Sequence, residues 1–543
     1  MSKTATKHLL SGDEAVALAA YHAGIQLGTG YPGTPSTEIL ETFSEMGGKS
    51  QWAPNEKVAL EVGLGVAFGG ARALVTMKHV GLNVAADPLF TAAYTDIKGA
   101  LIIISADDPG MASSQNEQDN RRYAVAAGIP LFEPADSQEA YDFLFQAIEV
   151  SERWSIPVLF RMTTRVCHSK TIVNAHMPPL KPADVHFERN IRERVMIPAY
   201  ARPAHRKLRK KLMEIAEWNE TSSLNQVYGN GSSLGMITSG VAFNHAMEAE
   251  PDAAILKLGM TYPLPAAKIR NFVQKVERCY VVEEGDPYLY ESLKAFDLPV
   301  KKNAETFRFG ELNVNRVRKI LAQDETPEVA VKPGKPPQLC PGCPHRTVFT
   351  VLNELGCIVA GDIGCYTLGV LSPFEAMDTC VCMGASIGVG LGLRHVLPRD
   401  QARRVVSVIG DSTFVHSGIT GLVEMVYNAP DTGHVVMILD NETTAMTGLQ
   451  EHPGTGRSLD HKATNRVDFE ALIRAIGIDK VHVIDPQPSN LDNVKQLVQE
   501  SLQKEELTVI ITRRPCILAF GKIREYEKMN QAAAACDCSA CEF

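Results

Sequence analysis

Short runs of apolar and β-branched residues recur along the chain, and each is followed by a Gly-rich or amphipathic stretch of helical length. The runs lie at residues 72–78, 99–105, 155–162, 234–240, 253–259 and 279–284, and then at 356–364, 379–384, 404–410, 434–441, 480–485 and 508–514. Near-continuous apolar strands that alternate with helices are typical of parallel sheets covered by helices on both faces. The pattern therefore predicts a multi-domain α/β protein.

Two changes in composition indicate where domains end. Residues 170–230 lose the strand pattern and include the basic stretch ARPAHRKLRKKL, and residues 322–338 are rich in proline and charge. The basic stretch is either an anion-binding segment or the solvated face of a helix between domains, and we expect the second. The predicted organisation is an α/β domain at 1–175, a basic connector at 176–230, a second α/β domain at 231–321, a linker at 322–338, a third α/β domain at 339–525 and a cysteine-containing tail at 526–543.

Composition narrows the classes of function. The 543 residues include 54 Lys and Arg against 63 Asp and Glu, so the chain lacks the basic excess of a general nucleic-acid binder. Its start, MSKTATKHLL, has no apolar signal-peptide core, and its most apolar run, 100–104, is far shorter than the roughly 18 residues that a membrane span needs. Twelve cysteines in this length do not indicate a disulfide scaffold. We expect a cytoplasmic protein that binds neither nucleic acid nor membrane.

Polar residues that bind phosphate and metal follow two of the strongest predicted strands. Gly410-Asp411-Ser412 ends one strand, and Asp440-Asn441, separated from Ser412 by 27 residues, ends the next. Open parallel sheets place ligands at the carboxyl ends of their strands. The oxygens of Asp411 and Asn441 suit Mg²⁺, Gly410 allows close backbone approach, and the helix that follows residue 413 can present its N-terminus to phosphate. The alternative is an Asx turn at each strand end.

This pair of motifs resembles the GDG…NN motif of enzymes that bind thiamine diphosphate, with Ser412 in place of the last glycine. The resemblance implies that Asp411 and Asn441 hold Mg²⁺ through their side chains and Thr443 through its carbonyl. The cofactor also needs a carboxylate beside its aminopyrimidine, for which Glu56 is the candidate and Glu61 the competitor. Taken alone, a Glu in the first turn of a helix usually compensates the helix dipole.

Seven stretches together resemble the large subunit of indolepyruvate ferredoxin oxidoreductases, in the 2-oxoacid:ferredoxin oxidoreductase superfamily. They are GYPGTPSTEI (30–39), NEKVALEVGLG (55–65), ALVTMKHVGLNVAADP (73–88), DDPGMASSQNEQDNRR (107–122), LCPGCPHR (339–346), GDIGCYTLG (361–369) and LDNETTAMTGLQEHPGTG (439–456), and the match runs from about residue 8 to 520. The resemblance implies a pyrimidine-binding first domain, a second domain like the transketolase C-terminal domain, and a third domain that binds the diphosphate. It also implies that Gly361, Asp362 and Gly364 contact the cofactor.

The same resemblance assigns roles near the substrate. Glu56 takes the cofactor-activating role, and Thr34 offers a hydroxyl to the oxo or carboxylate group of the substrate. Arg121 or Arg122 is a candidate for binding the substrate carboxylate through a guanidinium fork. Lys78 and His79 follow a strand end and are plausible pocket residues, although each taken alone is more often structural.

The cysteines fall into three groups. Cys340 and Cys343 form a C-x2-C hairpin, and by order and spacing they resemble, together with Cys365 and Cys516, the ligands of a 4Fe-4S cluster. Zinc, or inert buried thiols, are the competing interpretations. Five others, Cys167, Cys279, Cys357, Cys380 and Cys382, lie in or near apolar strands and are expected in the core. The last three, Cys536, Cys538 and Cys541, lack the spacing of the ferredoxin-type domain that normally follows in this family, so we expect a disordered or partner-docked tail, or a cluster completed by a partner's ligand.

These implications lead to one main hypothesis. The chain is expected to catalyse the CoA-dependent oxidative decarboxylation of an aryl 2-oxoacid such as indolepyruvate or phenylpyruvate, with one-electron transfer through the cluster to ferredoxin or another acceptor. The expected partners are a smaller, beta- or gamma-type subunit and a second large subunit, which together form a dimer of heterodimers. The alternatives are a non-oxidative decarboxylase, lyase or ligase and a non-catalytic scaffold that binds the cofactor structurally.

Overall fold

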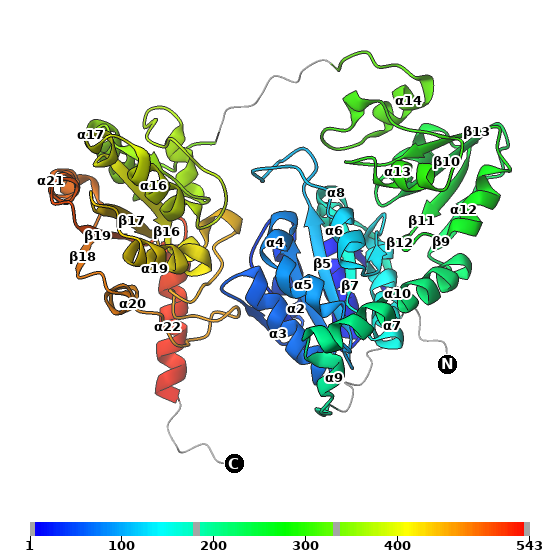
Figure 1. The fold of residues 1–543 in the computed structure, drawn as a ribbon, viewed down its shortest axis with the longest axis horizontal. Helices are drawn as coiled ribbons and strands as arrows, with labels where there is room; N and C mark the ends of the chain where they lie inside the picture. Colours follow the sequence, from blue (N-terminus) through cyan, green and yellow to red (C-terminus); the bar gives the residue numbers. More distant parts are fainter. Residues whose placement is uncertain (1–5, 177–184, 329–336, 537–543) are drawn as a thin grey trace. The chain divides into compact units, whose positions relative to one another are not determined.

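The structure, a computed structural model, describes residues 6–176, 185–328 and 337–536 of the chain. The chain divides into two compact units, Met1–Ala330 and Val331–Phe543, and each is described here by itself (Figure 1). No helix of the described residues is long and apolar enough to cross a membrane.

A seven-stranded sheet forms the centre of the first domain. Its order is β12 (Met260–Tyr262), β6 (Leu131–Phe132), β7 (Val158–Thr163), β5 (Leu101–Asp107), β4 (Ala73–Lys78), β2 (Leu27–Gly30) and β3 (Ser50–Trp52). All pairs are parallel except β12 with β6. Strands β5 and β7 are buried along their whole length, as expected for strands that are covered on both faces.

Helices cover both faces of this sheet (Figure 1). They are α1 (Gly12–His22), α2 (Thr37–Glu45), α3 (Glu56–Phe68), α4 (His79–Val84), α5 (Ala86–Ala92), α6 (Arg121–Ala127), α7 (Ser137–Trp154) and α8 (Thr164–His168). A separate antiparallel pair, β1 (Thr6–Leu10) and β8 (Thr171–Ala175), joins the two ends of the domain.

The basic connector is mainly helical. It contains α9 (Ile191–Arg194) and α10 (Pro198–Thr221), and α10 buries an apolar stripe that includes Leu208, Leu212 and Ile215. Most of its basic residues are exposed, as expected for the solvated face of a helix.

The second domain contains a five-stranded sheet in the order β14 (Val300–Lys301), β13 (Arg278–Val282), β10 (Leu234–Ser239), β11 (Ala254–Leu258) and β9 (Asn225–Tyr228). Its helices are α11 (Ala242–Ala249), α12 (Ala266–Val273), α13 (Tyr288–Ala295), η1 (Glu305–Phe307) and α14 (Val314–Ala322). The domain begins at β9, before the predicted boundary at 231. Strand β12, which follows β11 of this domain along the chain, pairs with β6 and so forms the edge strand of the first domain's sheet.

The second unit contains a fully parallel sheet in the order β15 (Ile358–Ala360), β16 (Val405–Gly410), β17 (His434–Asp440), β19 (Leu507–Arg513) and β18 (Lys480–Ile484). Its helices are α15 (His345–Glu354), η2 (Cys365–Val370), α16 (Ala385–Val396), α17 (Arg399–Ala402), α18 (Asp411–Thr413), the π-helix η3 (Phe414–Gly418), α19 (Ile419–Tyr427), η4 (Ala445–Thr447), α20 (Phe469–Ile476), η5 (Pro488–Asn490), α21 (Leu491–Gln503) and α22 (Phe520–Cys536). Helix α22 crosses the predicted boundary at 526, so the first half of the predicted tail is helical. Cys538 and Cys541, and the side chain of Cys536, lie outside the described residues.

One predicted strand was wrong. Residues 379–384 form a loop, with a single bridge between Ala360 and Thr379. Cys380 and Cys382 in this loop are exposed, so they do not belong to the core, whereas Cys167 and Cys279 are buried as expected and Cys357 is half-buried. The alternating TCVCMG pattern fits an edge strand as well as a loop, and here Val381 is exposed.

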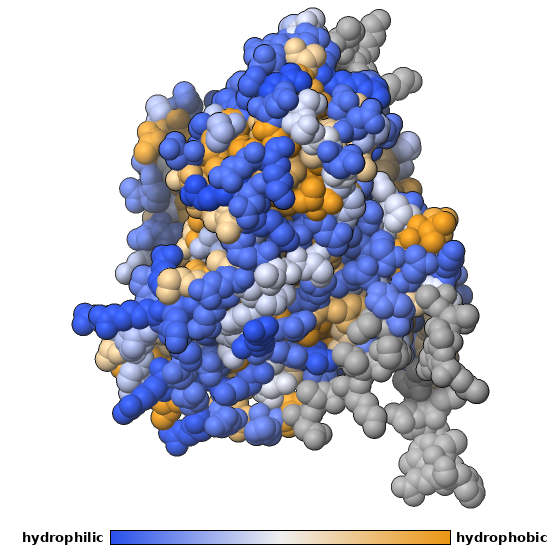
Figure 2. Space-filling model, turned by 90° about the vertical axis from the view of Figure 1, so that its right-hand side faces the viewer, coloured by the Kyte–Doolittle hydropathy of each residue, from blue (hydrophilic) through white to orange (hydrophobic). Residues whose placement is uncertain are grey.

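The face of the molecule drawn in Figure 2 is mostly hydrophilic, with hydrophobic side chains gathered in several separate groups. Buried apolar residues form one large core in the first domain and two smaller clusters in each of the other two domains.

Candidate functional site

Four neighbouring strands of the second unit deliver polar residues to one edge of their sheet. Strands β15, β16, β17 and β19 are adjacent and parallel, so their carboxyl ends lie together. The segments that follow them hold the predicted cofactor, metal and cysteine residues: Gly361, Asp362, Gly364 and Cys365 after β15, Asp411 and Ser412 after β16, Asn441 and Thr443 after β17, and Cys516 after β19. The sheet topology thus brings together residues that are up to 155 positions apart.

Asp411 is buried and well supported. Its Oδ1 accepts a hydrogen bond from the Ser412 N–H at 2.8 Å, and its Oδ2 accepts from the N–H groups of Asn441 at 3.2 Å and Glu442 at 2.8 Å. His452 Nε2 lies 3.2 Å from Oδ2. Burial alone would raise the pKa of this carboxyl, but His452 and the backbone N–H groups outweigh it and hold the pKa below its usual value. The side chain is therefore a carboxylate at neutral pH.

Asn441 distinguishes a ligand site from a simple turn. Its Oδ1 is buried and has no hydrogen-bond partner within the described part of the chain, while its Nδ2 lies 3.4 Å from His345 Nε2. An Asx turn would explain the bonds of Asp411 to nearby N–H groups, but it leaves this oxygen unpaired at a real energetic cost. A buried amide oxygen beside a carboxylate fits an oxygen-seeking cation such as Mg²⁺.

Two histidines at this site were missed by the sequence analysis. His345, at the start of α15, is buried, and burial lowers its pKa to about 4 although Asp411 acts in the opposite direction, so the ring is neutral. His452 is also buried and contacts Asp411. Both lie inside stretches that resemble the family, but neither has a spacing that singles it out from a structural histidine.

Two of the predicted cofactor glycines also have a packing role. A Cβ on Gly410 would lie 2.5 Å from the Tyr366 ring, and one on Gly364 would lie 2.2 Å from it. Tyr366 is buried and donates its hydroxyl to the Ile363 carbonyl at 2.9 Å. These two glycines therefore make room for Tyr366, which supports the loop after β15.

Asp362 anchors that loop to the next helix. Its carboxylate accepts hydrogen bonds from the N–H groups of Gly384 at 2.9 Å and Ser386 at 3.0 Å, at the start of α16. Ser412, which replaces the expected glycine, accepts a hydrogen bond from Thr444 at 2.9 Å. The Thr443 hydroxyl donates to the Gln450 carbonyl at 3.3 Å. The predicted metal ligand is a different atom, the backbone carbonyl oxygen of Thr443.

The four predicted cluster cysteines are close enough to influence one another. The pKa of Cys343 and of Cys365 is raised to about 11, mainly by burial and in smaller part by the other cysteines of the set. A Cβ on Gly342, in the C-x2-C hairpin, would lie 3.0 Å from Ile517, the neighbour of Cys516. The Cys516 N–H donates to the Asn441 carbonyl at 2.9 Å, which links the thiol group to the candidate metal site.

The spacing of these sulfurs bears on the identity of the metal. Tetrahedral zinc with Zn–S bonds of about 2.3 Å places its sulfurs about 3.8 Å apart. Among the described residues, no three of the four sulfurs lie within 4.8 Å of one another. Among the described residues, these thiols are therefore not gathered as closely as the ligands of one tetrahedral zinc ion.

The carboxyl edge of the first sheet forms a second group of candidates. Asn55 caps α3 by accepting from the Val58 N–H at 2.9 Å, and this places Glu56 in the first helical turn after β3. Glu56 is 4% exposed, and a Cβ on Gly81 of α4 would lie 2.5 Å from its Oε1. Gly81 is thus a glycine because the Glu56 carboxylate occupies the neighbouring space. Glu61 instead pairs with Lys57 on the exposed side of α3.

Thr34 and Lys78 lie at the carboxyl ends of two neighbouring strands, β2 and β4. Thr34 is half-buried in the turn between β2 and α2, and Lys78 ends β4 and donates to the Ser113 carbonyl at 3.0 Å. Burial lowers the pKa of Lys78, against the opposing effects of Asp108 and Glu56. His79 is fully buried, with Nε2 3.1 Å from the Asn116 carbonyl oxygen and Nδ1 without a partner in the part of the chain that the structure describes.

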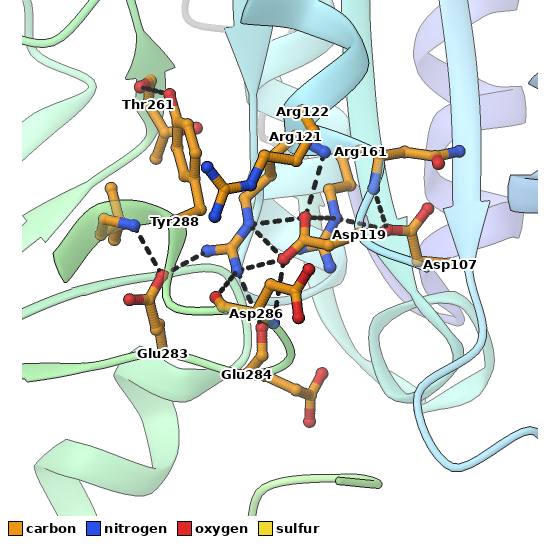
Figure 3. A network of polar contacts seen from close by, with 12 residues as sticks. Asp107, Asp119, Arg121, Arg122, Arg161, Thr261, Glu283, Glu284, Asp286 and Tyr288 are labelled. Carbon is orange, nitrogen blue, oxygen red and sulfur yellow. Dashed lines mark hydrogen bonds and ion pairs between the residues drawn. The ribbon is translucent and has the colours of Figure 1, made fainter. Parts of the chain in front are cut away.

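The structure does not leave Arg121 available to a substrate (Figure 3). Its side chain is 1% exposed, and its guanidinium donates to Asp119, to Glu283 at 2.9 Å and to the carbonyls of Glu284 at 3.1 Å and Asp286 at 2.8 Å. All three guanidinium nitrogens donate to protein acceptors, so the observed role of Arg121 is to join the first domain to the second. Arg122 is half-exposed and pairs with Glu291 at 2.5 Å.

A second buried arginine completes this network. Arg161 on β7 donates to Asp107 at 2.6 Å and to Glu133 at 2.7 Å, and Glu133 also accepts from the Thr261 hydroxyl at 2.6 Å. The two arginines compensate the buried carboxylates of both domains, which explains how so many charges are buried at this boundary.

Two family models match the chain. Residues 18–220 match "Pyruvate flavodoxin/ferredoxin oxidoreductase, thiamine diP-bdg", and residues 362–512 match "Thiamine pyrophosphate enzyme, C-terminal TPP binding domain". In fold, the chain is similar to 2-oxoglutarate:ferredoxin oxidoreductase from Magnetococcus marinus, with a TM-score of 0.50 and 15% identity over 59% of this chain and 65% of that one. Fold and matched domains define a subunit of a thiamine-diphosphate-dependent 2-oxoacid oxidoreductase.

Relatives in sequence define the family more narrowly. The chain is 39% identical to indolepyruvate oxidoreductase subunit IorA of Archaeoglobus fulgidus, over 98% of this chain and 90% of that protein. It is 38% identical to the subunit of the same name from Methanothermobacter thermautotrophicus, over 95% of this chain and 88% of that protein. The chain belongs to the family of indolepyruvate oxidoreductase IorA subunits.

Proposed function

We propose that this chain is the catalytic subunit of a CoA-dependent oxidoreductase that acts on aryl 2-oxoacids of the indolepyruvate or phenylpyruvate type. The observation that carries the proposal is the shared sheet edge of the second unit, where an orphaned Asn441 oxygen and the Asp411 carboxylate lie beside four grouped cysteines. The aryl substrate comes from the names of the relatives and from the sequence resemblance, and CoA comes from the sequence resemblance.

The cofactor residues divide between the two units. Asp411, Asn441 and the Thr443 carbonyl would hold Mg²⁺, and Gly410, Ser412 and the loop from Gly361 to Gly364 would surround the diphosphate. When bound, thiamine diphosphate supplies the nucleophilic carbon and the electron sink that 2-oxoacid decarboxylation needs. Glu56 would hold a proton at its carboxylate beside the aminopyrimidine, and its burial keeps water from competing for that contact.

The four cysteines would hold a 4Fe-4S cluster. Their thiols come from a hairpin, from the loop after β15 and from the segment after β19, and among the described residues they are not gathered as closely as the ligands of one tetrahedral zinc ion. Oxidation of a 2-oxoacid carboxylate with CoA gives acyl-CoA, CO₂, two electrons and one proton, so an acceptor close to the active site must take the electrons one at a time. A ferredoxin-like protein is the proposed final acceptor.

The substrate is handled by the first unit in this proposal. The Thr34 hydroxyl is half-buried on a tight turn, which suits a fixed donor to the oxo or carboxylate oxygen. Arg121 is left out of the substrate site because its fork is committed to Asp119 and Glu283. As members of this family are named subunits, we propose a smaller partner subunit and a dimer of such heterodimers.

Anaerobic purification of the chain with its partner tests the activity. Indolepyruvate or phenylpyruvate together with CoA should reduce a viologen dye, and both compounds should be required. Release of CO₂ and free aldehyde without dye reduction would contradict the oxidative proposal and support a non-oxidative decarboxylase.

A cysteine variant tests the cluster separately. We expect Cys516→Ser to lower iron and acid-labile sulfide and to abolish the dye reduction, because it removes one of four ligands. Cys380→Ser is the matched control, since Cys380 is exposed and lies outside the set. Equal iron in both variants, or zinc in place of iron in the wild-type protein, would rule the cluster out.

A further inference from the structure

A buried carboxylate in the first domain has no adequate partner. Asp13, in the first turn of α1, is 1% exposed. Neither of its carboxylate oxygens has a close hydrogen-bond partner within the described residues, and the neighbouring group is the buried thiol of Cys167, a weak and uncharged donor. A buried carboxylate without hydrogen bonds or a counter-charge is strongly disfavoured, so the side chain is either neutral or compensated by something that the protein chain does not supply.

Two further ligand groups face the same point. One carboxylate oxygen of Glu38 on α2, one ring nitrogen of His168 at the end of α8 and one oxygen of Asp13 all lie within 4.8 Å of one another. They come from three helices, and among the described residues neither Glu38 nor His168 has an ion pair or hydrogen bond elsewhere. Close packing holds the helices in place, since a Cβ on Gly12 would lie 2.2 Å from the Val166 carbonyl oxygen.

Ordinary helix electrostatics do not account for this group. Acidic residues in the first turns of α1 and α2 complement the helix dipoles, and this explains an exposed Glu38. It does not explain why Asp13 is buried, or why a second carboxylate approaches it. The nearby cation Lys170 is directed to Glu14 at 2.9 Å, so it does not neutralise the pair. In the absence of a cation, burial and the neighbouring Glu38 raise the pKa of Asp13.

We propose that Asp13, Glu38 and His168 form a binding site for a divalent transition-metal ion, with Zn²⁺ as the best match. Two carboxylate oxygens and one imidazole nitrogen are a donor set typical of zinc, with water in the remaining position. An imidazole donor disfavours Mg²⁺ and Ca²⁺, which prefer oxygen ligands alone. The site lies near the same carboxyl edge of the first sheet, because α2 follows β2 and α8 follows β7. None of its three residues is among those proposed to bind the cofactor or the substrate, so it does not depend on the proposed function.

A metal ion here would brace the turn that carries Thr34. Glu38 is the second residue of α2, and that helix follows the Tyr31–Ser36 turn directly. Coordination to Asp13 and His168 ties the start of α2 to α1 and α8, and thereby restricts the position of the turn. The role is that of a structural clamp rather than a reacting metal.

Zinc content measures the site directly. The full chain, purified anaerobically with its partner and saturated with Mg²⁺ and thiamine diphosphate, is dialysed against micromolar Zn²⁺ and analysed by mass spectrometry. The wild-type protein should hold one more zinc ion per chain than Glu38→Gln or His168→Ala, and zinc should raise its melting temperature but not theirs. Glu45→Gln, an exposed acid on the same helix, should behave as wild type.

Two outcomes would overturn the site. Equal zinc content in wild type, Glu38→Gln and His168→Ala would show that these side chains bind no metal. Absence of any zinc-dependent stabilisation in wild type would show that Asp13 is kept neutral by a proton. Asp13→Asn gives a further check, and because Glu38 and His168 are exposed the test stands even if that buried substitution prevents folding.

Discussion

At the scale of single residues, the Asn441 oxygen, which has no hydrogen-bond partner among the described residues, is the most informative atom of the candidate cofactor site. Its position after β17 follows from the sequence, because Asp411 and Asn441 each end a strong apolar run. Its lack of a partner does not, since that depends on His345 and the backbone around Asp411. His345 and His452 were not predicted for the same reason. No sequence pattern marks either residue, and only the packing of the chain brings them to the site.

The role of Arg121 could not be inferred from the sequence. In sequence it stands beside Arg122, and nothing in its neighbours separates a substrate-binding arginine from a structural one. The structure separates them through burial and through Glu283, which is 162 positions away along the chain. Long-range ion pairs of this kind cannot be inferred from local pattern.

Gly81 is predicted to determine the position of the Glu56 carboxylate, the candidate acid. Gly81→Ala adds a Cβ that would lie 2.5 Å from Glu56 Oε1, so the carboxylate must move while the backbone remains in place. We expect kcat to fall at least about 10-fold, part of the roughly 100- to 10,000-fold that a positioned acid–base group supplies. Steady-state kinetics at saturating cofactor measure it. Gly65→Ala in α3, where an added Cβ meets nothing within 4 Å, should keep the wild-type rate; a loss of rate in both variants would refute the explanation.

At the scale of elements, the apolar strands of the parallel sheets were predicted well because burial on both faces leaves a continuous apolar run. Such runs coincide with strands β4, β5, β7, β16, β17 and β19. Short strands such as β2, with sequence LGTG, were not predicted, because Gly28 and Gly30 are required by close packing against Leu40 and Thr76 rather than by any strand preference. The segment 379–384 shows the reverse error, because it was predicted as a strand and forms a loop.

The boundary between the first two domains should respond to pH. Burial raises the pKa of Glu284 to about 7, although the Leu312 N–H and Arg161 oppose the shift. Because the folded protein binds this proton more tightly than the unfolded chain, stability is highest below pH 4.5 for this group and declines as pH rises towards about 7. Glu284→Gln should reduce that decline in urea unfolding experiments, whereas the exposed Glu305→Gln should not; an unchanged slope in Glu284→Gln would contradict the assignment.

At the scale of the whole molecule, the candidate cofactor residues lie in two different units. Glu56 belongs to the first unit and Asp411 to the second, and each unit has its own core. Family resemblance predicted this division from the sequence, together with the transketolase-like domain between the two. Which copy of each unit completes an active site is a property of the assembly.

Mixing two inactive variants tests the proposed dimer. If each active site combines the first unit of one copy with the second unit of another, Glu56→Gln chains mixed with Asp411→Asn chains form dimers with one intact site. Random pairing then restores about a quarter of the wild-type activity. Each variant mixed with itself is the control. No recovery in a mixture shown by mass spectrometry to contain mixed dimers would place both halves of the site in one chain.

The segment at 361–365, directly after β15, would link two steps in the maturation of the proposed enzyme. It carries Asp362, which fixes the start of α16, and Cys365, one of the four grouped thiols. In the proposed enzyme, insertion of the cluster would thus shape the backbone that receives the diphosphate, and the apoprotein would acquire its inorganic centre before its vitamin-derived cofactor. Air damage would then act twice, since loss of the cluster also releases thiamine diphosphate. We expect the affinity for this cofactor, measured by calorimetry, to drop at least about 10-fold after exposure to oxygen in the wild-type protein; unchanged affinity would separate the two events.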